Sequence, residues 1–195
     1  FTTMPANFVG LMMAPSTAEA IADEARLLRS QGAQVIVVTA HIGSKCKNLD
    51  TPNDLSSCEK NEELFRLIGD LPKGAVDVIV GGHTHAAIAH RISDISVIES
   101  YASGRAFGRV DLRISPDGHV TSSKIHKPIV MCGEADGAPL VPPAQCQPGQ
   151  YEGKPVVPDP ALEKIVGEAL ARASVRRAEK LGVTLAKPVT KSYGS

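Results

Sequence analysis

The fold is decided by residues 76–85, which read Val-Asp-Val-Ile-Val-Gly-Gly-His-Thr-His. Their first five positions are rich in β-branched side chains, and a similar run, Val-Ile-Val-Val-Thr-Ala, occupies residues 35–40. Continuous runs of this kind are typical of parallel strands that are covered on both faces. Each run leads into a histidine, His41 in the first case and His83, after two glycines, in the second. Both segments are therefore predicted to be buried strands of one sheet.

A helical pattern precedes each of these strands. Apolar residues recur every three or four positions over residues 18–28 and stop at Gly32, and a shorter helix is predicted over residues 61–68. The order helix, strand, loop, helix, strand indicates an α/β sheet with crossover helices.

The pattern changes in the second half of the chain. Residues 96–101, 107–114 and 119–130 are strand candidates, and Ser-Pro-Asp-Gly at residues 115–118 is a hairpin turn signal. An antiparallel layer is therefore expected beside the sheet, and the predicted fold class is α/β, arranged as an α+β sandwich.

The C-terminal part is expected to be a loop followed by a helix. Residues 131–158 are rich in Pro and Gly and predict a loop. Asp159 is a natural N-cap with Pro160 at the first helical position, and the predicted helix closes at Gly182.

Composition narrows the classes of partner. Lys plus Arg and Asp plus Glu are both 21, so the net charge is zero, whereas a protein that binds nucleic acid normally carries a basic excess. No apolar run approaches the ~20 residues that cross a bilayer. We therefore expect neither a nucleic-acid partner nor a membrane partner.

The first residues do not form a signal peptide, and we expect a mature or excised segment that has lost its targeting signal.

The four cysteines form two close pairs, Cys46 with Cys58 and Cys132 with Cys146. Four cysteines allow three connectivities, of which we favour the two local pairings. Disulfides indicate an oxidising compartment, here the periplasm or the extracellular space. The alternative is four reduced thiols in a cytosolic protein. A zinc site is disfavoured, because neither pair has the two-residue spacing of a zinc knuckle.

Three histidines, His41, His83 and His85, are candidate metal ligands. All follow a predicted strand at its carboxyl end, the edge of an open α/β sheet where ligands bind. His83 and His85 are two residues apart, a spacing that places both rings on one side of an extended backbone. Gly81 and Gly82 permit backbone angles and close approaches that a Cβ would obstruct. Neutral imidazole is a good ligand for zinc, manganese and similar ions.

Other interpretations of the histidines remain open. His41 alone is also suited to capping or hydrogen bonding at a strand end, and the pair is compatible with a structural role. His90, His119 and His126 have no comparable setting and are interpreted as surface or packing residues.

These segments together resemble a known family. Residues 76–85 are similar to the Gly-Gly-His-Thr-His segment of calcineurin-like metallophosphoesterases, specifically of the 5'-nucleotidase branch. Residues 18–43, which end in LRSQGAQVIVVTAHIG, resemble the unit that precedes it, and residues 99–112 resemble the Gly-rich turn and strand that follow. Residues 158–160 with the final helix resemble the helix that links the catalytic domain to a C-terminal nucleotide-recognition domain, and residues 188–195 resemble the start of that domain.

The resemblance implies a centre of two divalent metal ions, such as zinc or manganese, that hydrolyses a phosphate ester. The position of His41 would bind one ion together with that of His83, and the position of His85 would bind the other. Thr84 would be a backbone spacer. The implied substrate is a nucleotide or another small phosphate ester.

The same resemblance implies a division of the chain. Residues 1–130 would be the C-terminal part of the catalytic domain, 131–158 a loop, 159–182 a linker helix and 183–195 the start of the recognition domain.

The departures from the family concern its remaining metal ligands. These lie in earlier motifs, an Asp-x-His, a Gly-Asp with the bridging aspartate and an Asn-His-Asp/Glu, and this chain has no counterpart of them in that position. The last motif also supplies the histidine that assists the leaving group, so no catalytic residue is expected in this chain. Without a bridging carboxylate, charge compensation is lost, and we expect the chain alone to bind metal weakly or not at all and to be inactive.

Several alternatives stay open on the sequence. Within the superfamily the parent protein could act on cyclic nucleotides or sugar nucleotides. The chain could also be a binding scaffold without catalysis, or hold one zinc ion on its three histidines. Because the predicted strands lack neighbours from the first part of the family's sheet, we expect a companion chain or a homo-oligomer.

Overall fold

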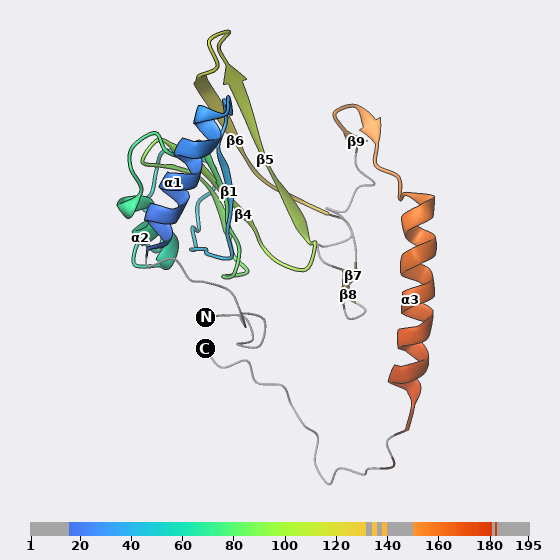
Figure 1. Cartoon of the computed structure of the whole chain (residues 1–195). Helices are drawn as coiled ribbons and strands as arrows, with labels where there is room; N and C mark the ends of the chain where they lie inside the picture. The colour runs from blue at the N-terminus through green and yellow to red at the C-terminus, as the bar shows by residue number, and fades with distance from the viewer. Residues whose placement is uncertain (1–15, 132–133, 136–137, 140–149, 181, 183–195) are drawn as a thin grey trace. The chain divides into compact units, whose positions relative to one another are not determined.

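The computed structural model describes residues 16–131, 134–135, 138–139, 150–180 and 182. They fall into two compact units, Phe1–Gln147 and Pro148–Ser195, which are described separately (Figure 1).

A four-stranded mixed sheet is the centre of the first unit. Its order is β1 (Val37–Thr39), β2 (Val78–Val80), β4 (Ile95–Ser100) and β3 (Ala87–Ile92). The strands β1, β2 and β4 are parallel, and β3 is antiparallel to β4. The predicted α/β sheet is confirmed, and β3 is a strand that the sequence pattern did not indicate.

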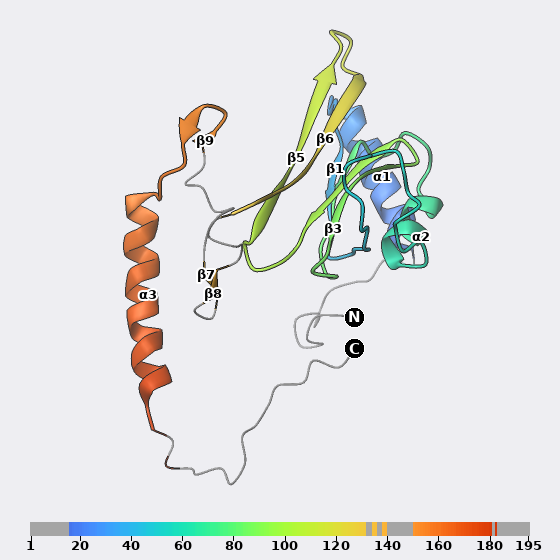
Figure 2. The ribbon, with the colours of Figure 1, turned by 180° about the vertical axis from the view of Figure 1, so that it is seen from behind.

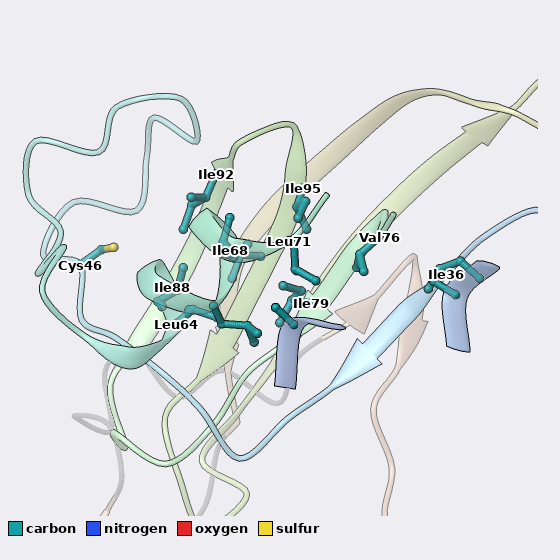
Figure 3. Packing of buried hydrophobic residues seen from close by; sticks show 14 residues of the cluster. Ile36, Cys46, Leu64, Ile68, Leu71, Val76, Ile79, Ile88, Ile92 and Ile95 are labelled. Atoms are coloured by element: carbon teal, nitrogen blue, oxygen red, sulfur yellow. The ribbon is translucent and has the colours of Figure 1, made fainter. Parts of the chain in front are cut away.

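Two helices cover one face of this sheet. Helix α1 (Thr17–Ser30) begins where the Ser16 hydroxyl accepts a hydrogen bond from the Glu19 amide, and it turns alanines toward the sheet. Helix α2 (Glu63–Asp70) buries leucine and isoleucine. Both helices contribute to one apolar cluster that includes the sheet residues Ile79, Ile88 and Ile95, which Figure 3 labels.

An antiparallel hairpin packs on the other face. It consists of β5 (Ala106–Ile114) and β6 (Val120–Val130), and it contacts β3 and β4 (Figure 2). A small cluster of Ala89, Ile98 and Ile125 lies between the layers. The hydroxyls of Ser96 and Ser123 also meet there at 2.7 Å. The antiparallel layer that the sequence predicted is confirmed for residues 107–114 and 119–130, whereas the third candidate, residues 96–101, lies in β4 of the central sheet and is parallel to β2. Strands β7 (Glu134–Ala135) and β8 (Ala138–Pro139) form a further short antiparallel pair.

The second unit holds the predicted C-terminal helix. Helix α3 (Pro160–Ala178) is capped by Asp159, whose carboxylate accepts from the amides of Ala161 and Leu162. None of its residues is buried. The segment predicted as a loop contains one more short pair, β9 (Gln150–Tyr151) with β10 (Lys154–Pro155). The start of the implied recognition domain, residues 183–195, lies outside the described residues.

The covering of β1 differs from the expectation. The strand has three residues rather than six, and Val37 is 53% exposed, so it is not covered on both faces. The physical reason is its place at the edge of the sheet, because the hairpin lies on β3 and β4 at the opposite side.

Cys46 and Cys58 form the predicted local disulfide. The second predicted pair, Cys132 with Cys146, lies outside the described residues. Disulfides are typical of proteins from oxidising compartments. Among the described residues, no helix combines the length and apolar character required to cross a membrane.

Asp77 fastens α1 to the sheet. Its Oδ2 accepts from the Arg29 guanidinium at 2.8 Å and from the Ile36 amide at 2.8 Å. The carboxylate side chain is 18% exposed, and it joins the end of α1, the approach to β1 and the approach to β2.

We expect Asp77→Ala to lower the free energy of unfolding by about 1–3 kcal/mol, because the Ile36 amide loses its acceptor in a partly buried position. The matched control is Asp23→Ala, which removes an ion pair with Arg26 between side chains that are 72% and 75% exposed, and should change stability by less than about 0.5 kcal/mol. Urea denaturation measures both values. Equal effects of the two substitutions would contradict this role of Asp77.

Candidate metal site at the rim of the sheet

The predicted histidines lie at one edge of the sheet. Because β1, β2 and β4 are parallel, their carboxyl ends share a rim. His41 follows β1, and His83 and His85 follow β2. The carboxyl end of β4 adds Glu99, a residue that the sequence did not single out as part of the site.

The structure brings His41 and His83 together. The Nε2 of His41 lies 3.2 Å from the Nδ1 of His83, and the ring centroids are 4.9 Å apart with the planes tilted by 53°. Both residues are exposed. Two nitrogens bound to one zinc ion at about 2.0–2.1 Å, with an angle of about 100°, also stand about 3.2 Å apart. The two rings are within hydrogen-bond distance of each other, and their nitrogen separation also matches that of two ligands of a single divalent ion.

His85 does not join that pair. It is exposed, and its ligand atoms do not form a group within 4.8 Å with those of both other histidines. The expected extended backbone is also wrong, because φ is 84° at His83 and 56° at His85. The left-handed region costs a residue with a side chain on the order of 1–3 kcal/mol, and such strain concentrates at functional sites.

A buried carboxyl beneath the histidine loops ties them together. Glu99 is 1% exposed, and its Oε1 accepts from the Thr84 amide at 3.1 Å. Its Oε2 accepts from the Ser44 amide at 3.3 Å. The Thr84 hydroxyl lies 2.8 Å from Glu99 Oε1 and 2.9 Å from the Ser44 carbonyl oxygen. Thr84 therefore anchors its loop through its side chain, beyond the spacer role that the resemblance implies.

Burial raises the pKa of Glu99 above its ordinary value, against the opposing effect of the hydrogen bonds from Thr84 and Ser44. The hydrogen-bond geometry agrees with a raised pKa. The Thr84 hydroxyl has one hydrogen and two oxygen neighbours. When Glu99 is protonated, it donates to the Thr84 hydroxyl, which in turn donates to the Ser44 carbonyl. Each of these three oxygen atoms then takes part in a hydrogen bond.

Two glycines allow the loops to approach this closely. A Cβ on Gly43 would lie 2.3 Å from Glu99 Oε2 and 2.3 Å from the Gly82 carbonyl oxygen. A Cβ on Gly81 would lie 2.7 Å from the Ile42 carbonyl oxygen, as the expected close approach requires. Gly82 is different, because a Cβ there would meet no atom closer than 3.9 Å.

The sequence contained one signal for Glu99. It is the only charged residue of the β4 run Ile-Ser-Val-Ile-Glu-Ser, and a charge inside a buried run requires partners. Its partners come from two distant loops, so their identity was not readable from local pattern.

The comparisons with known proteins leave the family open. No protein-family model matches the chain, and no curated protein matches it significantly.

We expect Gly43→Ala to disrupt the rim, because the added methyl group overlaps the Gly82 backbone and the Glu99 carboxyl. The loss of unfolding free energy should be about 1–3 kcal/mol, the usual range for overpacking. The control is Gly69→Ala in α2, where a Cβ meets nothing within 4 Å. There the helix propensity of alanine should stabilise by up to about 1 kcal/mol. Denaturant unfolding distinguishes the two, and a neutral Gly43→Ala would contradict the packing described.

The raised pKa of Glu99 predicts a pH dependence of stability. The stabilising contribution of the protonated carboxyl is complete below the ordinary value of 4.5 and is lost as pH rises through the higher folded value. The unfolding free energy of the wild type should therefore fall relative to that of Glu99→Gln as pH rises from about 4, and then level off. Urea denaturation of both proteins over this range measures the difference. If the unfolding free energy of the wild type instead rose relative to that of Glu99→Gln as pH increases, the pKa of Glu99 would be lowered in the folded protein, and the prediction would be wrong.

Proposed function

We propose that this chain forms part of the active site of a metal-dependent phosphoesterase that hydrolyses 5'-nucleotides. The observation that carries the proposal is the pair His41 and His83, whose ring nitrogens converge to 3.2 Å at the carboxyl rim of parallel strands. The same two positions share one ion in the 5'-nucleotidase branch that the sequence resembles.

The residues have separate roles in this proposal. His41 and His83 hold one divalent ion, and His85 holds a second. Two divalent ions, when bound, activate water and stabilise the charge of an in-line displacement at phosphorus. Glu99 and Thr84 act as positioning residues, since their hydrogen bonds hold the loops that carry His41 and His83 at a fixed separation.

Carboxylate ligands from outside this chain complete the centre. The rim is open and exposed at His41, His83 and His85, so further ligands can reach it. Neutral histidines alone compensate little of the charge of two divalent ions. The chain by itself therefore binds metal weakly and does not turn over. The disulfide supports a periplasmic or extracellular location, where the substrate is an external nucleotide.

Manganese titration tests the ligand assignment on the chain alone. We expect Mn²⁺ to broaden the imidazole NMR signals of His41 and His83 selectively, because a paramagnetic ion acts most strongly on its ligands. His83→Ala should remove the effect on His41. The matched control is His119→Ala, which removes an exposed histidine near the β5–β6 turn and should leave the broadening unchanged. Broadening of His41 that survives His83→Ala would refute the shared site.

Phosphate release from AMP tests the reaction. The chain with Mn²⁺ should release none above buffer, and it should become active when a polypeptide with the carboxylate ligands completes the site. In that complete protein His83→Ala should lower kcat/KM by at least about 100-fold. Loss of a residue that only hydrogen-bonds to a metal ligand already lowers metal affinity or activity by up to about 100-fold, and loss of the ligand itself should cost at least as much. Turnover by the chain alone at the rate of a complete enzyme would contradict the proposal, as would an active His83→Ala protein.

A further inference from the structure

A second cluster of metal-binding side chains lies away from the rim. The sulfur atoms of Cys46 and Cys58 and a ring nitrogen of His90 all lie within 4.8 Å of one another. Among the residues that the structure describes, no other group of three or more His, Cys, Asp or Glu meets this condition. The cysteines come from the loop before α2, and His90 comes from the middle of β3. The fold therefore adds to the cysteine pair a third ligand that cysteine spacing could not reveal.

One ring nitrogen of His90 is held by a hydrogen bond to the backbone, a feature that metal-bound histidines share. Its Nδ1 lies 3.2 Å from the Pro52 carbonyl oxygen, and because a carbonyl only accepts, Nδ1 carries the proton. A backbone carbonyl on one ring nitrogen is a common means of fixing the tautomer of a metal ligand. With the single ring proton on Nδ1, the lone pair is on Nε2.

The Nε2 of His90 is the unexplained atom. The residue is 0% exposed, and Nε2 has no hydrogen-bond partner among the described residues. Leaving a buried polar atom unpaired costs about 1–3 kcal/mol, so such atoms call for an explanation. Ile88 and Ile92, two positions before and after His90 on β3, belong to the apolar cluster that also includes Cys46, and Figure 3 labels these three residues.

We propose that reduction of the Cys46–Cys58 disulfide converts this cluster into a binding site for one zinc ion, with Cys46, Cys58 and His90 as ligands. Two thiolates and one imidazole are a ligand set that zinc prefers, with a fourth position left open. In the disulfide the sulfurs are poor ligands, because the thiolate is the form that binds metal. The site is thus closed when oxidised and available when reduced.

The chemistry balances with a dithiol as the reductant. Exchange with a dithiol breaks the Cys46–Cys58 bond and transfers two electrons to its sulfurs, while the dithiol becomes a disulfide. Binding of Zn²⁺ then releases the two thiol protons and forms two sulfur–zinc bonds.

The surroundings permit both steps. Cys58 is only partly buried, which gives the reductant and the ion access, whereas Cys46 and His90 are buried. Two thiolates on tetrahedral zinc stand about 3.8 Å apart, so the sulfurs must separate. The two cysteines face each other across an isolated antiparallel bridge rather than within the central sheet, so the loop can widen without breaking the sheet.

Cobalt is the probe for this site, because Co²⁺ replaces zinc and shows sulfur-to-cobalt charge-transfer absorption only when thiolates bind it. The chain reduced with a phosphine should show this absorption, saturating at one ion per chain, and the oxidised chain should show none. The titration is repeated in a Cys132→Ser, Cys146→Ser background, where the absorption should persist. It should disappear in Cys58→Ser.

His90→Gln distinguishes a third ligand from a simple dithiol site. We expect His90→Gln to weaken cobalt binding by at least about tenfold, because loss of a residue that only hydrogen-bonds to a metal ligand already lowers metal affinity by about that factor. The control His119→Gln should leave the affinity unchanged. Circular dichroism of the reduced chain shows whether the protein stays folded after the disulfide is broken. Unchanged affinity in His90→Gln, equal binding by the oxidised chain, or unfolding on reduction would each overturn the proposal. The histidine rim cannot produce this signal, because it has no sulfur, so the result is independent of the proposed phosphoesterase function.

Discussion

The burial of Glu99 is the constraint on which the rim of the sheet depends. A carboxyl group at 1% exposure is unfavourable unless hydrogen bonds replace the water that it loses. Those bonds come from Ser44, on the loop after β1, and from Thr84, on the loop after β2. One side chain at the end of β4 therefore sets the positions of two loops, and with them the separation of His41 and His83.

The two candidate metal sites have opposite environments that suit different ions. The rim is exposed and carries imidazoles on strained backbone, so its charge compensation must come from elsewhere. The cluster of Cys46, Cys58 and His90 is largely buried, and it is assembled by the loop that packs along β3. That loop also shields the strand, because the Arg91 amide donates to the Pro52 carbonyl and the Cys46 amide to the Ala87 carbonyl. An edge strand covered in this way is protected from pairing with other chains.

Local pattern was sufficient for most of the elements. The helices α1 and α3 follow from apolar spacing and from the caps Ser16 and Asp159, which act within a few residues of the chain. The β5–β6 hairpin follows from its turn. Strand β3 was missed because its residues, Ala-Ile-Ala-His-Arg-Ile, are covered on both faces and so do not alternate in polarity. The covering of β1 was misjudged because the position of a strand within a sheet depends on the other strands.

The sequence by itself determined which residues stand at the ends of the parallel strands, and so it located His41, His83 and His85. Only the tertiary structure decided that His41 and His83 meet and that His85 does not complete a compact group with both of them. It also decided that the backbone at His83 and His85 is left-handed rather than extended. It also decided the partners of Glu99 and the third ligand beside the disulfide. The hydrogen bonds at the rim join residues that are 15 to 55 positions apart, from Thr84 with Glu99 to Ser44 with Glu99. Sequence pattern does not show which residues so far apart come close in space.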